Sequence, residues 1–140
     1  MNAAIVFHWE QPAALTDPRA QKKLFTRWTH TAKAFGVVDL FLIDVDGIVK
    51  TPFGDSEISL TIVDSLDEAL LLMNKRSPVF VEQGGAPLAS FRYPERPVFV
   101  FGSDYGQLDR ADLSIPSVGP LHSDVACGII LADWNVNRWR

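Results

Sequence analysis

The chain has 140 residues, of which 47% are apolar and 21% charged, and this composition is typical of a folded domain and not of a disordered segment. We therefore expect a single domain over residues 1–140. The formal net charge of -4 argues against a general nucleic-acid binder, because lysine and arginine supply most of the non-specific affinity for phosphates. No apolar run approaches the roughly 20 residues of a membrane span. The lone Cys127 cannot form an internal disulfide, which is typical of a protein in a reducing compartment. Together, the two observations predict a cytoplasmic protein outside the membrane.

The first half of the chain predicts a strand, a helix and a second strand. The apolar run 3–8 favours a buried strand. Thr16 or Asp17 can cap a helix over 18–35, which has proline at its first position. The nearly continuous apolar run 37–43 then predicts a strand covered on both faces, as in a parallel sheet. Apolar residues recur at helical spacing in the predicted helix: Leu24, Trp28, Ala32 and Phe35.

The second half continues to alternate between strands and helices. One helix follows a cap at Asp64 or Ser65, and a last helix starts with Ser123 as its cap. Residues 83–87 read as a turn. Together these elements predict an α/β fold with a mostly parallel sheet, helices on both faces and ligand chemistry at the carboxyl ends of the strands. The predicted strands are 58–63, 78–82, 97–102 and 113–115.

Basic residues gather in the first predicted helix. A local positive face can therefore exist on an acidic chain, although an ordinary solvated helix face is the structural alternative. The residues concerned are Arg19, Lys22, Lys23, Arg27, His30 and Lys33.

Three motifs in the last third of the chain point to a known family. They are Phe-Gly-Ser-Asp at 101–104, Ile-Pro at 115–116 and Ser-Asp-Val-Ala at 123–126. They resemble the last two motifs of the SpoU-type RNA ribose methyltransferases of the SPOUT superfamily, which read Phe-Gly-Ser-Glu, an Ile-Pro strand end and a Ser-Leu-Asn helix start. The segments 34–44 and 64–70 are similar to earlier parts of that family, so the resemblance spans almost the whole chain.

This resemblance implies both a fold and a function. In the family three strand-end loops wrap the methyl donor S-adenosylmethionine, and the third threads through the others to form a C-terminal trefoil knot. The implied activity is methyl transfer to RNA, with a tRNA ribose 2'-hydroxyl as the acceptor. The implied assembly is a homodimer.

The resemblance also implies which residues hold the cofactor. Gly102 matches a strand-end glycine, where the missing Cβ lets backbone approach a ligand closely. Ile115 matches the residue whose backbone contacts the adenine, while Phe80 and Val81 match another strand end. Ser123 matches the serine at the start of the last helix. The structural alternatives are a strand terminator for Gly102 and a plain N-cap for Ser123.

The first motif of the family is not matched. His30 stands at the position of its catalytic arginine, and Leu24 at that of its asparagine. A ribose hydroxyl has a high pKa, so transfer needs a group that accepts or steers its proton. His30 can do this near neutral pH, Arg27 one helical turn earlier can restore a guanidinium, and His8 is a third candidate. A knotted cofactor-binding or partner-binding protein without catalysis is therefore the alternative.

The last motifs depart from the family pattern as well. Asp104 replaces the motif glutamate, and Gly106 arrives one place early. The family's asparagine near the last helix corresponds either to Asp124 or to His122. These differences leave the acceptor and its proton pathway open.

A rival interpretation comes from the end of the second predicted strand. Asp44-Val45-Asp46-Gly47 is similar to the nucleophile motif of haloacid-dehalogenase-type phosphatases, in which two carboxylates bind magnesium and act at phosphorus. Ile48 stands where that family has threonine, and the strand lies second and not first. The structural alternative is a turn in which Asp44 and Asp46 accept hydrogen bonds from nearby amides.

Two further residue sets carry weaker signals. The three histidines and Cys127 lack the spacing of a metal site. Tryptophans lie toward both ends of the chain and predict either ordinary core packing or helices through which two copies pair. They are Trp9, Trp28, Trp134 and Trp139.

Overall fold

A computed structural model describes residues 3–8, 17–45, 47, 49, 57–103 and 108–139, in which strands and helices alternate as predicted. The strands are β1 (Ala4–His8), β2 (Asp39–Ile43), β3 (Ser59–Val63), β4 (Ser77–Pro87), β5 (Pro97–Phe101) and β6 (Leu113–Ser114). The helices are α1 (Pro18–Ala34), α2 (Leu66–Leu72), α3 (Ser123–Asn137) and the short 3₁₀ helix η2 (Leu88–Ser90). Within these ranges no helix is long and apolar enough to cross a bilayer.

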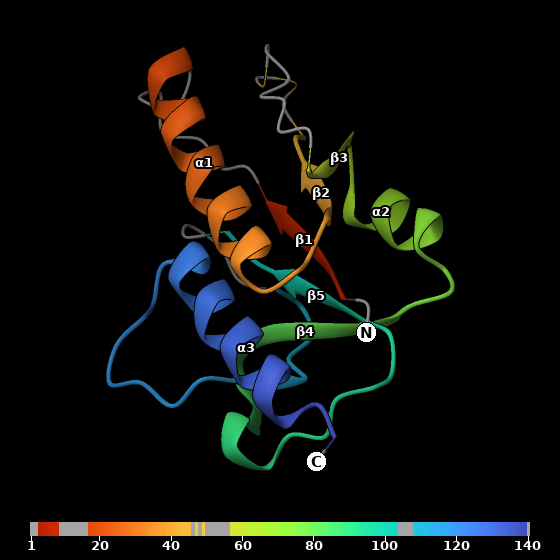
Figure 1. The fold of residues 1–140 in the computed structure, drawn as a ribbon, viewed down its shortest axis with the longest axis vertical. Helices are drawn as coiled ribbons and strands as arrows, with labels where there is room; N and C mark the ends of the chain where they lie inside the picture. Colours follow the sequence, from red (N-terminus) through yellow and green to blue (C-terminus); the bar gives the residue numbers. More distant parts are fainter. Residues whose placement is uncertain are drawn as a thin grey trace.

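The strands form one sheet in the order β3-β2-β1-β5-β4-β6, and every neighbouring pair is parallel (Figure 1). β1 and β5 are adjacent at its centre. The chain continues from β1 toward β2 on one side and from β5 toward β6 on the other. In open α/β sheets ligands bind outside the carboxyl ends of the strands at such a reversal. The predicted α/β class with a parallel sheet is confirmed, and the trefoil knot stays a prediction.

Helices cover both faces of the sheet, as predicted. In Figure 1, α1 and α3 lie side by side on one face and α2 lies on the other. Successive residues of β1 divide between the two cores: Ile5 and Phe7 belong to the cluster beneath α1 and α3, and Ala4 and Val6 belong to the cluster beneath α2. This division explains why the strand is apolar throughout, since both sides of it are buried.

The tryptophans within the helices belong to the core. Trp28 of α1 stacks on Phe7 with ring centroids 4.4 Å apart, and Trp134 of α3 meets Phe99 edge-on at 6.4 Å. Both indoles are 3% exposed, whereas Trp139 is 79% exposed. Core packing is therefore the correct interpretation for these two residues, while Trp9 lies outside the described residues.

Two helix caps follow the sequence signals. Asp17 caps α1, because its Oδ1 accepts a hydrogen bond from Arg19 N at 3.1 Å. Ser65 caps α2, because its Oγ accepts from Glu68 N at 3.1 Å. Each cap satisfies an amide that has no partner within the helix. Thr16, the alternative cap, lies outside the described residues.

The buried side of α1 contains Trp28 and Ala32, as predicted, but differs from the predicted apolar stripe at its other positions. Phe25 is buried and Leu24 only half-buried, and Gln21 and Thr29 are buried as well. The spacing from Gln21 to Phe25, Trp28 and Thr29 is that of one helix face. The hydropathy pattern predicted that Leu24 is buried, whereas the buried face of the helix includes the polar residues Gln21 and Thr29.

β4 differs from its prediction. The segment 83–87 was expected to be a turn, but the structure has a strand that continues to Pro87 with an irregularity: both Val81 and Ala86 lie opposite Leu113 of β6. Gly84 has φ +94°, which a residue with a side chain rarely adopts. The extra residues therefore bulge out of the ladder, and the strand resumes beyond them.

Candidate functional site

Four of the five predicted cofactor residues lie on or directly after three neighbouring strands: Phe80 and Val81 where β4 pairs with the end of β5, Gly102 after β5 and Ile115 after β6. Val81 of β4 pairs with Phe101, the residue before Gly102, and lies opposite Leu113 on its other side. Ile115 follows β6 two residues after Leu113. The pairing thus brings Val81, Gly102 and the bend at Ile115 to one edge of the sheet, although they are far apart in the sequence.

Asp112 joins the start of β6 to β4. Its Oδ2 accepts from Phe80 N at 2.9 Å, and its own amide donates to Phe80 O at 2.8 Å. Its carbonyl accepts from Ala86 N at 3.0 Å, and Arg110 Nε donates to its Oδ1 at 3.0 Å. Sequence reasoning missed Asp112. The only available signal was an acidic residue directly before a short predicted strand.

Gly85 lies in the closest backbone approach at this edge. A Cβ at this position would lie 2.5 Å from Leu113 N and 2.8 Å from Leu113 C, both of them backbone atoms. The Ser114 hydroxyl donates to Gly85 O at 2.9 Å and holds the same junction. A side chain at Gly85 is therefore incompatible with the present spacing of β4 and β6.

Ser123 contacts the strand end directly. Its hydroxyl donates to Gly102 O at 2.6 Å, so the start of α3 is fastened to the end of β5. The predicted N-cap role is wrong, because His122 occupies the cap position and Ser123 is the first helical residue. The serine bonds a carbonyl of another element instead of an amide of its own helix. The resemblance had paired these two residues with one cofactor site, and the structure places them in contact.

His8 is the last residue of β1, and its side chain contacts the end of the neighbouring strand β5. Its Nδ1 is 2.8 Å from Phe101 O. A carbonyl oxygen only accepts hydrogen bonds, so Nδ1 is the donor in this contact, and Nε2 is the other ring nitrogen. The third candidate of the sequence analysis therefore stands next to Gly102, at the centre of the sheet.

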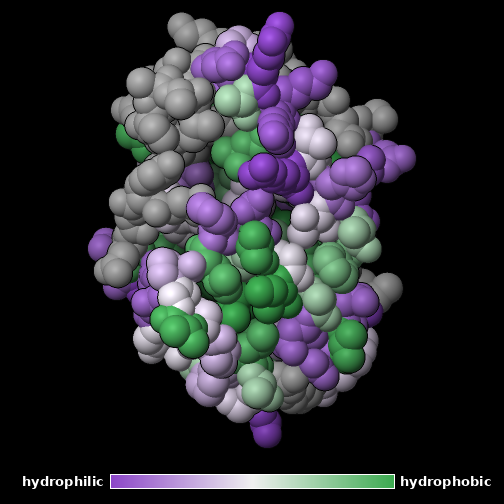
Figure 2. All heavy atoms as spheres, turned by 90° about the vertical axis from the view of Figure 1, so that its left-hand side faces the viewer, coloured by the Kyte–Doolittle hydropathy of each residue, from purple (hydrophilic) through white to green (hydrophobic). Residues whose placement is uncertain are grey.

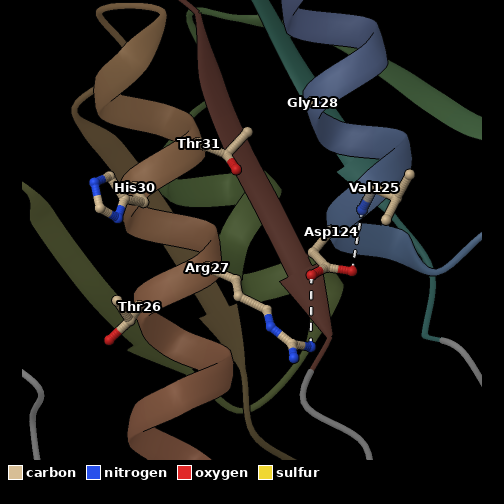
Figure 3. A pocket seen from close by; sticks show the side chains of 7 residues that line it. All are labelled: Thr26, Arg27, His30, Thr31, Asp124, Val125 and Gly128. Carbon is tan, nitrogen blue, oxygen red and sulfur yellow. Dashed lines mark hydrogen bonds and ion pairs between the residues drawn. The ribbon is translucent and has the colours of Figure 1, made fainter.

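The two main catalytic candidates line an open cavity of about 430 Å³ between α1 and α3 (Figure 3). Arg27 extends toward α3, and its Nη1 lies 4.0 Å from Asp124 Oδ2. The ring of His30 points away from α3 in the same view. This contact links Arg27 to the strand-end residues, because Asp124 directly follows Ser123, whose hydroxyl is bonded to Gly102 O. The cavity is lined by Thr26, Arg27, His30, Thr31, Asp124, Val125 and Gly128.

Cys127, a buried residue of α3, has an uncharged thiol. Cys127 lies one turn beyond Asp124 on α3 and is completely buried. Burial, and to a lesser extent the Asp124 carboxylate, raises the pKa of the Cys127 thiol. The residue is therefore a protonated core side chain and not a nucleophile, as its apolar surroundings in the sequence predicted.

Asp44 adopts the structural alternative to the phosphatase interpretation. It is 4% exposed, its Oδ2 accepts from Val49 N at 2.9 Å, and its carbonyl accepts from Gly47 N at 3.3 Å. These bonds hold the turn after β2. Asp46, its proposed partner, lies outside the described residues, as does Asp104. Within the part of the chain that is described, no three His, Cys, Asp or Glu residues are placed to hold a metal ion.

By sequence, no protein-family model and no curated protein matches the chain. Solved structures do match its fold. The tRNA-modifying enzyme TrmH/SpoU of A. aeolicus superposes with a TM-score of 0.71 at 19% identity, over 99% of this chain and 76% of that one. A protein solved to explain 2-OH methylation of C/U34 on tRNA superposes with a TM-score of 0.70 at 20% identity, over 98% and 95%.

A third similar structure was solved with a cofactor. The SpoU methyltransferase AviRb from Streptomyces viridochromogenes, in complex with AdoMet, superposes with a TM-score of 0.70 at 14% identity over 97% of this chain. The chain spans 60% of AviRb, and 59% of a TrmH-family protein from Porphyromonas gingivalis. At these identities the likeness establishes architecture. The chain has the fold of the SpoU/TrmH RNA methyltransferases, as its C-terminal motifs predicted.

Proposed function

We propose that this chain is an S-adenosylmethionine-dependent RNA methyltransferase domain that acts on a ribose 2'-hydroxyl, with tRNA as its substrate. The observation that carries the proposal is the meeting of the strand ends: Ser123 is bonded to Gly102, beside the junction of β4 and β6. The fold supports it, because one similar structure contains AdoMet and two others are described by their action on tRNA.

The chemistry of the strand ends fits a nucleoside sulfonium. Val81, Gly102 and Ile115 are each half-buried, so part of each remains accessible, while Phe101 and Leu113 behind them are buried. The apolar side chains of Val81 and Ile115 suit the faces of an adenine, and strand-end amides and carbonyls can satisfy its polar edge. We assign Phe80, Val81, Gly102, Ile115 and Ser123 to this binding site.

We assign the orientation of the ribose and the removal of its proton to residues of β1 and α1. When bound, the cofactor supplies an electrophilic methyl group. The chain has to orient a ribose hydroxyl in line with it and receive the proton. We assign orientation to Arg27, whose guanidinium reaches toward α3. The proton acceptor is His30, or His8, whose Nδ1 is fixed by Phe101 O.

The decisive experiment measures binding and transfer separately. Calorimetric titration with S-adenosylmethionine tests the strand-end site, and transfer of labelled methyl groups to unfractionated tRNA tests catalysis. We expect the parent chain to bind the cofactor and transfer methyl groups. Arg27→Ala should keep cofactor binding and lose about 10²-fold in transfer, since a substrate misplaced by about 1 Å can lose that much in rate.

Parallel variants identify the proton acceptor and control for surface charge. His30→Ala and His8→Ala are assayed in the same way, and the one that abolishes transfer while cofactor binding persists is the acceptor. Arg92→Ala removes an exposed cation outside the cavity and should change nothing. Cofactor binding without transfer by the parent would favour the knotted binding protein without catalysis. Absence of cofactor binding would refute both functions.

We also propose that two copies pair through the outer face of α3. Its buried side packs on the sheet, but its opposite side is apolar as well: Val125 is 48% and Val136 73% exposed, and Ile129 and Ala132 lie between them at helical spacing. Figure 2 shows the hydrophobic area on this side of the molecule. An exposed apolar face of this kind on a folded domain is typical of an interaction surface. A second copy would bury this face.

The homodimer is tested by sedimentation velocity. The parent should sediment as a dimer, and Val136→Asp, which places a charge within the apolar face, should sediment as a folded monomer. Leu72→Asp, on an exposed apolar residue of α2 on the other side of the sheet, is the matched control and should remain dimeric. A parent that sediments as a monomer would refute the pairing.

A further inference from the structure

We propose that the exposed side of the amino-terminal half of α1 is the surface that binds the RNA backbone. The surface, called here the cationic stripe, consists of Arg19, Lys22, Lys23 and Arg27. The inference rests on the proposed function and deepens it, because it names where the substrate is held. It also resolves the conflict between a net charge of -4 and a polyanionic substrate.

The stripe is a single face of the helix. Its four members follow the spacing i, i+3, i+4 and i+8, and all four are exposed. The buried residues of α1 occupy other positions around the helix. At a rise of about 1.5 Å per residue the stripe is about 12 Å long. Figure 2 shows the hydrophilic band in the upper part of the face made by α1 and α3, above the hydrophobic area.

The stripe has no role in stabilising its own helix. α1 contains no acidic residue, so no i,i+4 ion pair offsets the repulsion between its cations. Arg19 lies in the first turn, where the helix dipole favours negative charge and disfavours cations. Exposed cations that repel one another without an acidic partner in their own helix indicate a ligand of opposite charge.

The stripe also lies beside the proposed site. α1 ends at Ala34, shortly before β2 begins at Asp39, so α1 runs antiparallel to the strands and its amino end points to the carboxyl edge of the sheet. Figure 1 shows this end extending beyond β1. Arg27 belongs to the stripe and also lines the cavity with Asp124. A backbone bound along the stripe would therefore lead directly into the cavity.

The salt dependence of RNA binding tests the proposal. Binding of fluorescently labelled unfractionated tRNA is measured by anisotropy, without cofactor, over a series of KCl concentrations. Each phosphate neutralised contributes about 0.7 to 0.9 to the slope of log K against log salt concentration. The variant Arg19→Gln/Lys22→Gln/Lys23→Gln should therefore bind more weakly and have a slope flatter by about 2 to 3.

A matched triple variant separates the stripe from overall charge. Lys75→Gln/Arg92→Gln/Arg96→Gln removes three exposed cations from the segments that precede β4 and β5, at the opposite edge of the sheet, and should retain the parental slope. Equal flattening in both variants would overturn the proposal, because net charge alone would then explain binding. An unchanged slope in the α1 variant would also overturn it.

Two further measurements distinguish RNA binding by the stripe from dimerisation and from cofactor binding. If the α1 variant keeps tRNA binding but sediments as a monomer, the stripe is a contact between copies and the proposal is wrong. Cofactor titration is independent of the stripe, so the α1 variant should bind S-adenosylmethionine as the parent does. A parent that binds tRNA through the stripe but binds no cofactor would refute the proposed methyl transfer and leave the RNA surface established.

Discussion

The substitution Gly85→Ala tests the junction on which the proposed site is built. The added Cβ would lie 2.5 Å from Leu113 N, whereas ordinary contacts begin at 3.4 Å, so the backbones of β4 and β6 would have to separate by about 0.9 Å. Two hydrogen bonds span this junction, from Ala86 N to Asp112 O at 3.0 Å and from the Ser114 hydroxyl to Gly85 O at 2.9 Å. A separation of this size would break both.

The energetic cost follows from these two effects. Overpacking against backbone costs about 1–3 kcal/mol, and each lost hydrogen bond costs about 1 kcal/mol. We expect the free energy of unfolding in urea to fall by about 2–4 kcal/mol, since part of the strain is relieved when the bonds break. Because Ile115 follows β6, the affinity for S-adenosylmethionine should fall in the fraction that remains folded.

Gly119→Ala is the matched control for this experiment. An added Cβ there meets nothing within 4 Å, and the residue has no positive φ. Its unfolding free energy should stay within about 1 kcal/mol of the parent, with any change toward greater stability because the unfolded chain loses freedom. If Gly85→Ala unfolds like this control and binds the cofactor unchanged, the close approach of β4 and β6 does not position the site.

Three further outcomes are expected. Ser123→Ala should lower the unfolding free energy by about 1 kcal/mol and weaken cofactor binding, because Gly102 O loses its donor, whereas Ser123→Thr keeps the hydroxyl; equal urea midpoints for the two variants would contradict this. Asp112→Ala should cost about 2–3 kcal/mol in urea, and Asp112→Asn less, because the amide oxygen still accepts from Phe80 N. Burial raises the pKa of the Cys127 thiol above its ordinary value of 9.0, so the folded state keeps the proton that the unfolded chain loses, and stability should fall as the pH rises above about 9. A thiol-reactive dye should accordingly label Cys127 only at the rate of unfolding; rapid labelling of the folded chain would show that the thiol is accessible.

The sequence by itself determined the order and type of the main elements and the parallel class of the sheet. Local signals were sufficient for these features: Pro18 after Asp17 starts α1, Ser65 caps α2, and the nearly continuous apolar run 37–43, which contains β2, predicted cover on both faces. The motif around Gly102 also predicted the fold that the structural comparisons found. These features depend on residues that are close together in the chain, which is why they could be predicted.

Only the tertiary structure decided which of these side chains and backbone groups lie in contact. The bond from Ser123 to Gly102 spans 21 positions, and the link from Asp112 to Phe80 spans 32. No local pattern encodes such contacts, and local reasoning instead assigned Ser123 to a cap. The structure likewise separated Arg27, which extends toward α3, from His30, which points away from it, although the two lie one turn apart. Residues three apart lie on the same face of an α-helix, so helix rotation alone does not separate them. The packing of α3, which places Asp124 opposite Arg27, distinguishes the two, and that packing is fixed by the fold as a whole.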